Sequence, residues 1–183
     1  MSRVAPLETR KYPWYVRLIF WAQGRKYGKT LAPAYVWGRV PALMLGLQIY
    51  YRFLDRRGSL VDKALRSLVS ARVSQLNECQ FCFSLSSETL KALGISEEKL
   101  ASLGDHGRSP FFTDRERAAL RYAEAMSETG ARVDDAVFAQ LRPHFSEEQL
   151  VELTSWIAFQ NLSSRFNAAL DVPSQEFCLR KPG

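Results

Sequence analysis

The sequence predicts an all-α fold, and three observations carry that prediction. Apolar residues recur at three- and four-residue spacings through most of the chain, whereas the period-two alternation of strands is hard to find. Helix-capping signals precede several of these segments. The 183 residues are 46% hydrophobic and 24% charged, which is typical of an ordered globular domain that can bury a real core. We therefore expect a helical bundle.

The first expected helix covers residues 14–27, where apolar and aromatic side chains dominate. Glycine and proline punctuate the connection over residues 28–33. A short apolar helix is predicted over residues 41–53, and a loop over residues 56–59 follows it. These segments form an N-terminal helical layer.

The next helix is predicted from the apolar face that runs from Leu60 to Leu76. It should stop near Asn77. We expect Asn77 to act as the N-cap of the following helix, with Gln80 as its reciprocal partner three residues on. That helix should run to Leu93 and end at Gly94.

Capping signals also mark the later helices. Ser96 precedes two glutamates, as an N-cap does. Thr113 and Glu116 have the spacing of a capping box that opens a helix ending near Gly130, and the Ser146-x-x-Gln149 pair predicts a helix that reaches about residue 170.

These elements predict three regions with a soft boundary near residue 58. We expect an N-terminal helical extension that packs on the core or on a neighbouring subunit, a helical core that carries the Cys-x-x-Cys segment, and a C-terminal tail. The regions are residues 1–57, 58–172 and 173–183.

The net charge of +6 comes from the N-terminal part of the chain. Residues 1–40 contain eight Lys or Arg side chains against Glu8 alone, so the remainder is about neutral. Aromatic residues interleave with these cations over residues 11–29, as they do at membrane surfaces and at subunit interfaces. We favour packing on the core or on a neighbouring subunit over a membrane surface. No nucleic-acid partner is expected, because no recognition fold accompanies the charge.

The start of the chain has no apolar run of the kind a secretory signal contains, so a cytoplasmic location is expected. Three cysteines are too few for a disulfide scaffold. In a reducing compartment, the Cys79-x-x-Cys82 pair is typical of catalytic, redox or metal sites. Structural zinc needs four ligands, and no second pair exists, so we expect no metal. Cys178 lies in the expected tail and is interpreted as incidental.

The capping prediction places both thiols near the positive end of a helix dipole, where thiolates are favoured. Two thiols at this spacing can close a disulfide after one has attacked a peroxide or a substrate disulfide. The alternative is that both cysteines are small apolar fillers of the core. The spacing alone leaves these readings open.

The segment Ala71-Arg-Val-Ser-Gln-Leu-Asn-Glu-Cys-Gln-Phe-Cys82 resembles the signature of the carboxymuconolactone decarboxylase and alkylhydroperoxidase D-like family. The resemblance covers residues 58–172. It extends through residues 89–94, 96–100, 112–120 and 145–153.

The resemblance implies a helical bundle that forms a homo-oligomer and uses no cofactor. It also implies a thiol peroxidase or disulfide oxidoreductase whose substrate is a peroxide or a disulfide and whose cysteine pair is restored by a dithiol reductant protein. In the family the second cysteine attacks and the first resolves, which assigns Cys82 as peroxidatic and Cys79 as resolving, although the helix dipole alone favours Cys79. Lactone decarboxylation is a weak candidate, because the family's decarboxylases generally lack the pair.

The sequence departs from the family pattern at the proton relay. The relay histidine and glutamate are replaced by Ser86 and Ser67, and a serine hydroxyl is no general base at neutral pH. Glu78 is an accessory candidate, since a helix would place it on the face of Cys82, but support of the helix N-terminus is favoured. His106 and His144 are interpreted as surface or capping residues. Loss of the relay motivates the alternative of a catalytically weakened oligomer that acts as a binding or membrane-surface module.

Overall fold

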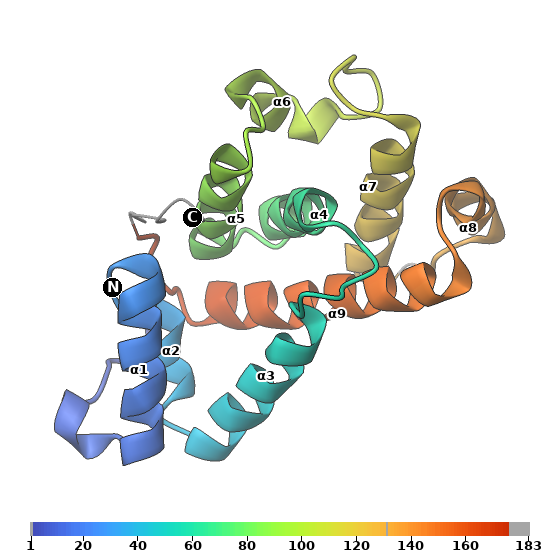
Figure 1. Ribbon diagram of the computed structural model, residues 1–183. Coiled ribbons are helices and arrows are strands. Elements are labelled where there is room, and N and C mark those ends of the chain that lie inside the picture. The colour runs from blue at the N-terminus through green and yellow to red at the C-terminus, as the bar shows by residue number, and fades with distance from the viewer. Residues whose placement is uncertain (1, 131, 176–183) are drawn as a thin grey trace.

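The computed structural model describes residues 2–130 and 132–175, and every regular element in that part of the chain is helical (Figure 1). The all-α prediction is confirmed. The α-helices are α1 (Trp14–Tyr27), α2 (Ala32–Trp37), α3 (Pro41–Leu54), α4 (Lys63–Leu76), α5 (Gln80–Ala92), α6 (Glu97–Ala101), α7 (Asp114–Ser127), α8 (Asp135–Leu141) and α9 (Glu147–Ala169). Short 3-10 turns cover Thr9–Lys11, Leu103–Asp105 and Arg142–His144.

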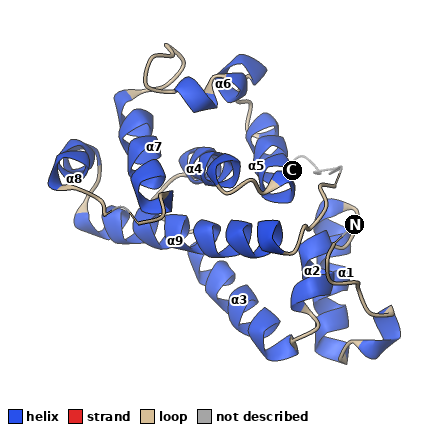
Figure 2. Ribbon diagram, turned by 180° about the vertical axis from the view of Figure 1, so that it is seen from behind, coloured by secondary structure: helices blue, strands red, loops and turns tan. Residues whose placement is uncertain are grey.

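The long helix α9 is the axis of the molecule. Helices α4, α5 and α7 lie on one side of it, and α3 with α1 and α2 lies on the other, as Figures 1 and 2 show. The main core forms where α4, α7 and α9 meet, around fully buried residues such as Leu68, Leu120 and Ile157. A smaller cluster around Val16, Phe20 and Met44 holds α1, α2 and α3 together. Residues of both clusters, among them Met44 and Trp156, line one cavity.

Glu152 anchors the connection between α3 and α4 to α9. Its side chain is 6% exposed and pairs with Arg56 at 2.6 Å. It also accepts hydrogen bonds from the Ser59 hydroxyl and from the Leu60 amide at 3.0 Å. Although burial opposes ionisation, these donors hold the pKa of Glu152 below its ordinary value. The buried carboxylate thus fixes where the N-terminal layer joins the core.

The N-terminal layer is also tied to the far end of α9. The Arg3 amide donates to the Leu170 carbonyl at 2.8 Å. The rings of Trp37 and Phe166 stack with their centroids 3.6 Å apart. These contacts place α2 against the last turns of α9, while the division of the chain at residue 57 stays a prediction.

Both predicted capping boxes are present. The Thr113 hydroxyl accepts a hydrogen bond from the Glu116 backbone amide, and the Glu116 carboxylate accepts one from the Thr113 backbone amide at 2.8 Å. Ser146 and Gln149 make the same reciprocal pair. Ser96 caps α6 as expected. The helix after Thr113 ends at Ser127, slightly before the predicted stop near Gly130.

The predicted cap of α5 is wrong. Asn77 is the C-cap of α4, and the N-cap of α5 is Cys79. The Asn77 side-chain amide instead donates to Asn161 and to Ser164 of α9, at 2.8 Å each. Tertiary hydrogen bonds therefore take this side chain away from the neighbouring helix. The later end of α5 agrees with the prediction, since Gly94 adopts a φ of 83°.

Two short helices were absent from the sequence-based prediction. Pro33 stands in the first turn of α2, where proline is favoured because no hydrogen bond to its nitrogen is needed. Asp134 caps α8 by accepting from the Val137 amide at 2.7 Å. Among the described residues, no helix is both long enough and apolar enough to cross a membrane.

Candidate redox site

Cys79 and Cys82 form a disulfide at the N-terminus of α5, with their Cα atoms 5.3 Å apart. Both residues are buried, at 3% and 5% exposure. They pack with Val36 of α2, with Phe81 and with Val172, which follows α9. The pair thus lies where the N-terminal layer, α5 and the end of α9 meet.

The sulfur of Cys79 is itself the cap of the helix. The Cys82 amide donates to Cys79 Sγ at 3.2 Å, in the way that an N-cap side chain satisfies the third residue of a helix. Both sulfurs therefore lie at the positive end of the α5 dipole, as the sequence predicted. That position favours the charged form of a thiol once the pair is reduced.

Asn167 is the nearest polar partner of Cys82. Its side-chain amide donates to Cys82 Sγ at 3.3 Å, and the residue is 2% exposed. Asn167 Oδ1 has no hydrogen-bond partner. Sequence reasoning missed this residue, because a single asparagine near the end of a long helix carries no motif.

A cavity of about 600 Å³ opens beside Cys82, between the N-terminal layer and helices α4, α5 and α9. Cys82 lines it, and among the described residues Cys79 does not. The α9 wall is made by one face of the helix. That face contains Trp156, Phe159, Gln160, Ser163 and Asn167.

The two serines that replace the relay residues lie at this cavity. Ser67 of α4 and Ser86 of α5 are both buried and both line it together with Cys82. The structure therefore brings the three positions to one site. It does not bring Glu78 there, because Glu78 precedes the N-cap, has a left-handed φ of 55° and is exposed. The expectation that Glu78 shares a helix face with Cys82 is wrong for that reason.

The histidines lie away from the cavity lining. His144 is half-buried in a 3-10 turn. His106 is 4% exposed, which corrects its interpretation as a surface residue. Its Nε2 lies 3.1 Å from Glu124, which also pairs with Arg72 at 2.6 Å. Although burial opposes ionisation, these two partners hold the pKa of Glu124 below its ordinary value.

The end of the cavity formed by α3 and the start of α4 is charged. Arg66 Nη1 pairs with Asp55 at 3.0 Å and donates to the Leu54 carbonyl at 3.1 Å. Its guanidinium lies over the Trp156 ring, 4.6 Å from the centroid. Burial raises the pKa of Tyr51, whose hydroxyl contacts Asp55, well above its ordinary value.

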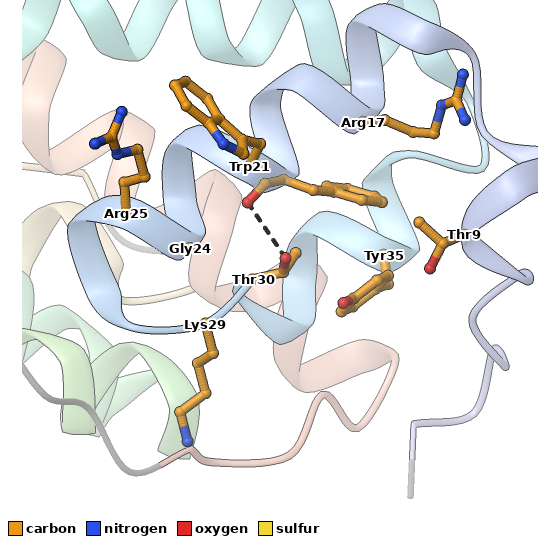
Figure 3. Close-up of a pocket in the computed structure, with 9 residues that line it drawn as sticks. Thr9, Arg17, Trp21, Gly24, Arg25, Lys29, Thr30 and Tyr35 are labelled. Atoms are coloured by element: carbon orange, nitrogen blue, oxygen red, sulfur yellow. Dashed lines mark hydrogen bonds between the residues drawn. The ribbon is translucent and has the colours of Figure 1, made fainter.

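A second, more open hollow lies on the outer side of α1 and α2 (Figure 3). Its cations are Arg17, Arg25 and Lys29. Figure 3 shows their charged ends pointing in different directions and not toward one point. The hollow therefore lacks the convergent donors of an anion site.

Among the described residues, no group of three or more His, Cys, Asp or Glu side chains is arranged to hold a metal ion. Cys178 falls outside the described part of the chain.

Residues 41–125 match the carboxymuconolactone decarboxylase family. An uncharacterized protein of Escherichia coli (strain K12), YnjA, is 42% identical over 168 residues, which is 92% of each chain. Uncharacterized protein YdfG of Bacillus subtilis (strain 168) is 30% identical over 61% of this chain and 77% of its own length.

The fold is shared with solved structures. An uncharacterized peroxidase-related protein from Ralstonia eutropha JMP134, with an alkylhydroperoxidase AhpD core, matches with a TM-score of 0.85 at 20% identity, over 96% of this chain and 93% of that one. The debrominase Bmp8 matches with a TM-score of 0.79 at 24% identity, over 93% and 90% of the two chains. At these identities the likeness concerns the fold.

Proposed function

We propose, from the premise that this chain belongs to the carboxymuconolactone decarboxylase and alkylhydroperoxidase D-like family, that it is a thiol peroxidase that uses Cys82 and Cys79. The family includes enzymes, and structural neighbours are peroxidase-related. The observation that carries the proposal is the placement of the pair. Cys82 lines a cavity large enough for an organic molecule, and Cys79 is within bonding distance of it.

The reaction proceeds in three balanced steps. The Cys82 thiolate attacks the terminal peroxide oxygen, the O–O bond breaks, an alcohol leaves with a proton from water, and Cys82 becomes a sulfenic acid. The Cys79 thiol then displaces water from this sulfenic acid and closes the disulfide. A dithiol protein reduces that disulfide by exchange and is oxidised to its own disulfide.

The groups around Cys82 suit the first step. The N-terminus of α5 and the Asn167 amide both stabilise negative charge on its sulfur. No histidine is among the described residues that line the cavity, and Ser67 and Ser86 cannot take a proton at neutral pH. We therefore expect an enzyme that is slower than members that keep the relay, by a factor of about 10²–10⁴.

Free-thiol titration before and after a small excess of peroxide tests the proposal. A Cys178→Ser background leaves only the pair to be counted. The protein that keeps both Cys79 and Cys82 should lose two thiols rapidly. A sulfenic acid should be trapped in the Cys79→Ser variant but not in the Cys82→Ser variant. Thiols that react no faster than free cysteine would contradict the proposal.

One observation favours a second candidate function, a surface-binding module. Trp14, Leu18 and Trp21 are each more than half exposed and follow one another along a single face of α1. Arg17 and Arg25 flank them, which is the composition of a helix that lies on an anionic membrane. Binding to anionic vesicles that disappears in a Trp14→Ala, Trp21→Ala variant would support this function. Binding that is unchanged in the variant would exclude it.

We also propose that a second copy of the chain covers the outer face of α3. Leu43, Ile49 and Phe53 are 57%, 50% and 67% exposed there. Apolar side chains that gather on one helix face are typical of contacts within homo-oligomers. A Phe53→Asp variant should be smaller than the wild type by light scattering, and equal masses would contradict the proposal.

A further inference from the structure

The cavity beside Cys82 carries charges that thiol chemistry does not require. The charged residues that line it are Lys26, Lys63 and Arg66 against Asp55. Lys63 and Arg66 are one turn apart on α4 and therefore belong to the same end of the cavity. The net positive charge of the wall favours an anionic ligand.

Arg66 keeps donor capacity beyond its ion pair with Asp55. Its side chain is 6% exposed, and only Nη1 is used for Asp55 and for the Leu54 carbonyl. Arg66 Nε is buried and has no hydrogen-bond partner. A buried donor without an acceptor is costly, and a ligand carboxylate that draws the guanidinium toward it would supply one.

This cationic end is far from the thiol. Arg66 lies over Trp156, whereas Cys82 contacts Asn167, and both of these partners are on the same face of α9. An α-helix rises about 1.5 Å per residue, so Trp156 and Asn167 are about 16 Å apart along α9. A ligand that reaches both ends must therefore be elongated.

The wall between the two ends is largely apolar. It includes Met44 and Leu47 of α3, Leu85 of α5 and Phe159 of α9. The apolar part of this wall gains free energy from burying a hydrocarbon chain, while Gln160 and Ser163 of α9 add polar groups to it. The cationic end, the apolar wall and the thiol together match a ligand that has a carboxylate, a long apolar chain and a group that reacts with a thiol.

We propose that the cavity binds a free long-chain carboxylic acid hydroperoxide, with its carboxylate at Lys63 and Arg66 and its peroxide group at Cys82. The inference rests on the proposed function for the fate of the peroxide and names its substrate class. The Cys82 thiolate takes the terminal peroxide oxygen, the O–O bond breaks, and a hydroxy acid leaves after its alkoxide gains a proton from water. The resulting sulfenic acid is resolved by Cys79 as above.

Binding of unreactive analogues tests the ligand class separately from the redox reaction. Calorimetry with Cys82→Ser protein would compare laurate with 1-dodecanol, which has the same chain without the charge. Laurate should bind about ten- to a hundredfold more tightly, because a charge-assisted hydrogen bond contributes about 1.5–3 kcal/mol and each 1.4 kcal/mol is about tenfold in affinity. The preference should shrink as salt screens the cations.

Variants locate the charge. Lys63→Met, at the exposed rim, should weaken laurate binding several-fold without changing dodecanol binding. Arg66→Met should remove the remaining preference, and Arg66→Lys should restore part of it. Arg52→Met makes the same charge change on α3 at a residue outside the cavity lining, and it should leave both affinities as they were. If Arg66→Met does not fold, the Lys63→Met variant alone tests whether the cationic end binds the carboxylate.

Equal affinities for laurate and dodecanol, or no binding of either, would overturn the ligand class. Wild-type reduction of tert-butyl hydroperoxide under those conditions would leave the peroxidase proposal standing. Conversely, a charge-dependent preference for laurate without any peroxide consumption by wild-type protein would support the ligand class and overturn the peroxidase. The two failures are therefore distinguishable.

Discussion

Replacing Asn167 by leucine should suppress the reactivity of Cys82 while leaving the fold in place. The Asn167 amide donates to Cys82 Sγ at 3.3 Å, and both residues are buried. Leucine keeps much of the side-chain volume and removes the donor. It also removes Asn167 Oδ1, which has no partner to lose. The change thus isolates the hydrogen bond to sulfur.

The magnitude follows from the charge of the acceptor. A hydrogen bond to a charged group contributes about 1.5–3 kcal/mol, and the reduced Cys82 is charged in its reactive form. One pH unit corresponds to about 1.36 kcal/mol, so the midpoint of the pH–rate profile should rise by about one to two units. At pH values below the original midpoint, the rate at constant pH should fall by about ten- to a hundredfold.

Alkylation by iodoacetamide as a function of pH measures this midpoint. The Cys79→Ser, Cys178→Ser background leaves Cys82 as the thiol observed. Ser163→Ala is the matched control, because Ser163 lies one turn from Asn167 on the cavity face of α9 and has no role toward sulfur in the proposal. A midpoint for Asn167→Leu that equals that of the control would refute the reasoning, provided that thermal unfolding shows both variants folded.

Three further changes test other features. Ser67→Glu with Ser86→His should rebuild the proton relay and raise peroxide consumption by about 10²-fold at neutral pH; no gain, or a gain that survives Cys82→Ser, would contradict the relay argument. Glu152→Gln should lower the free energy of unfolding by about 2–3 kcal/mol at neutral pH, because the donors around this buried side chain lose a charged acceptor. Since the folded pKa of Glu152 is depressed, its contribution is complete above the unfolded value and is lost as pH falls through the folded one, so urea titrations should show the two proteins converging in acid. Gly94→Ala should lower the free energy of unfolding by about 1 kcal/mol because Gly94 has a positive φ. Gly46→Ala, inside α3, should raise the free energy of unfolding by about 0.5–1 kcal/mol. Equal effects of the two changes in thermal unfolding would contradict the conformational argument.

Local signals in the sequence were sufficient to predict a helix start where the capping residues lie within the helix itself. The reciprocal pairs at Thr113 and Ser146 are complete within four residues, so both helix starts could be predicted. The cap of α5 could not, because Asn77 bonds to side chains more than eighty residues away. Cys79 is instead the N-cap of α5, a role that a sulfur rarely has.

The thiol pair was found from its spacing, but its surroundings were not. The cavity wall combines residues of α1 and α3 with residues of α9, and no local pattern links stretches so far apart in the chain. The places of Asn167 and Arg66 at the cavity could therefore be seen only in the folded structure. His106 was noted in the sequence, but its burial and its contact with Glu124 of α7 could not be predicted from local pattern.

The segment that matches the family ends at residue 125, and this has a consequence for the cavity. Both sulfurs, and the two serines at the relay positions, lie inside that segment. The α1 wall and the whole α9 wall, including Asn167, lie outside it. In the proposed function, the reacting sulfurs and much of the ligand contact therefore lie on separate stretches of chain. Under that proposal, substitutions in the flanking helices would change which molecule binds while the two sulfurs stay unchanged.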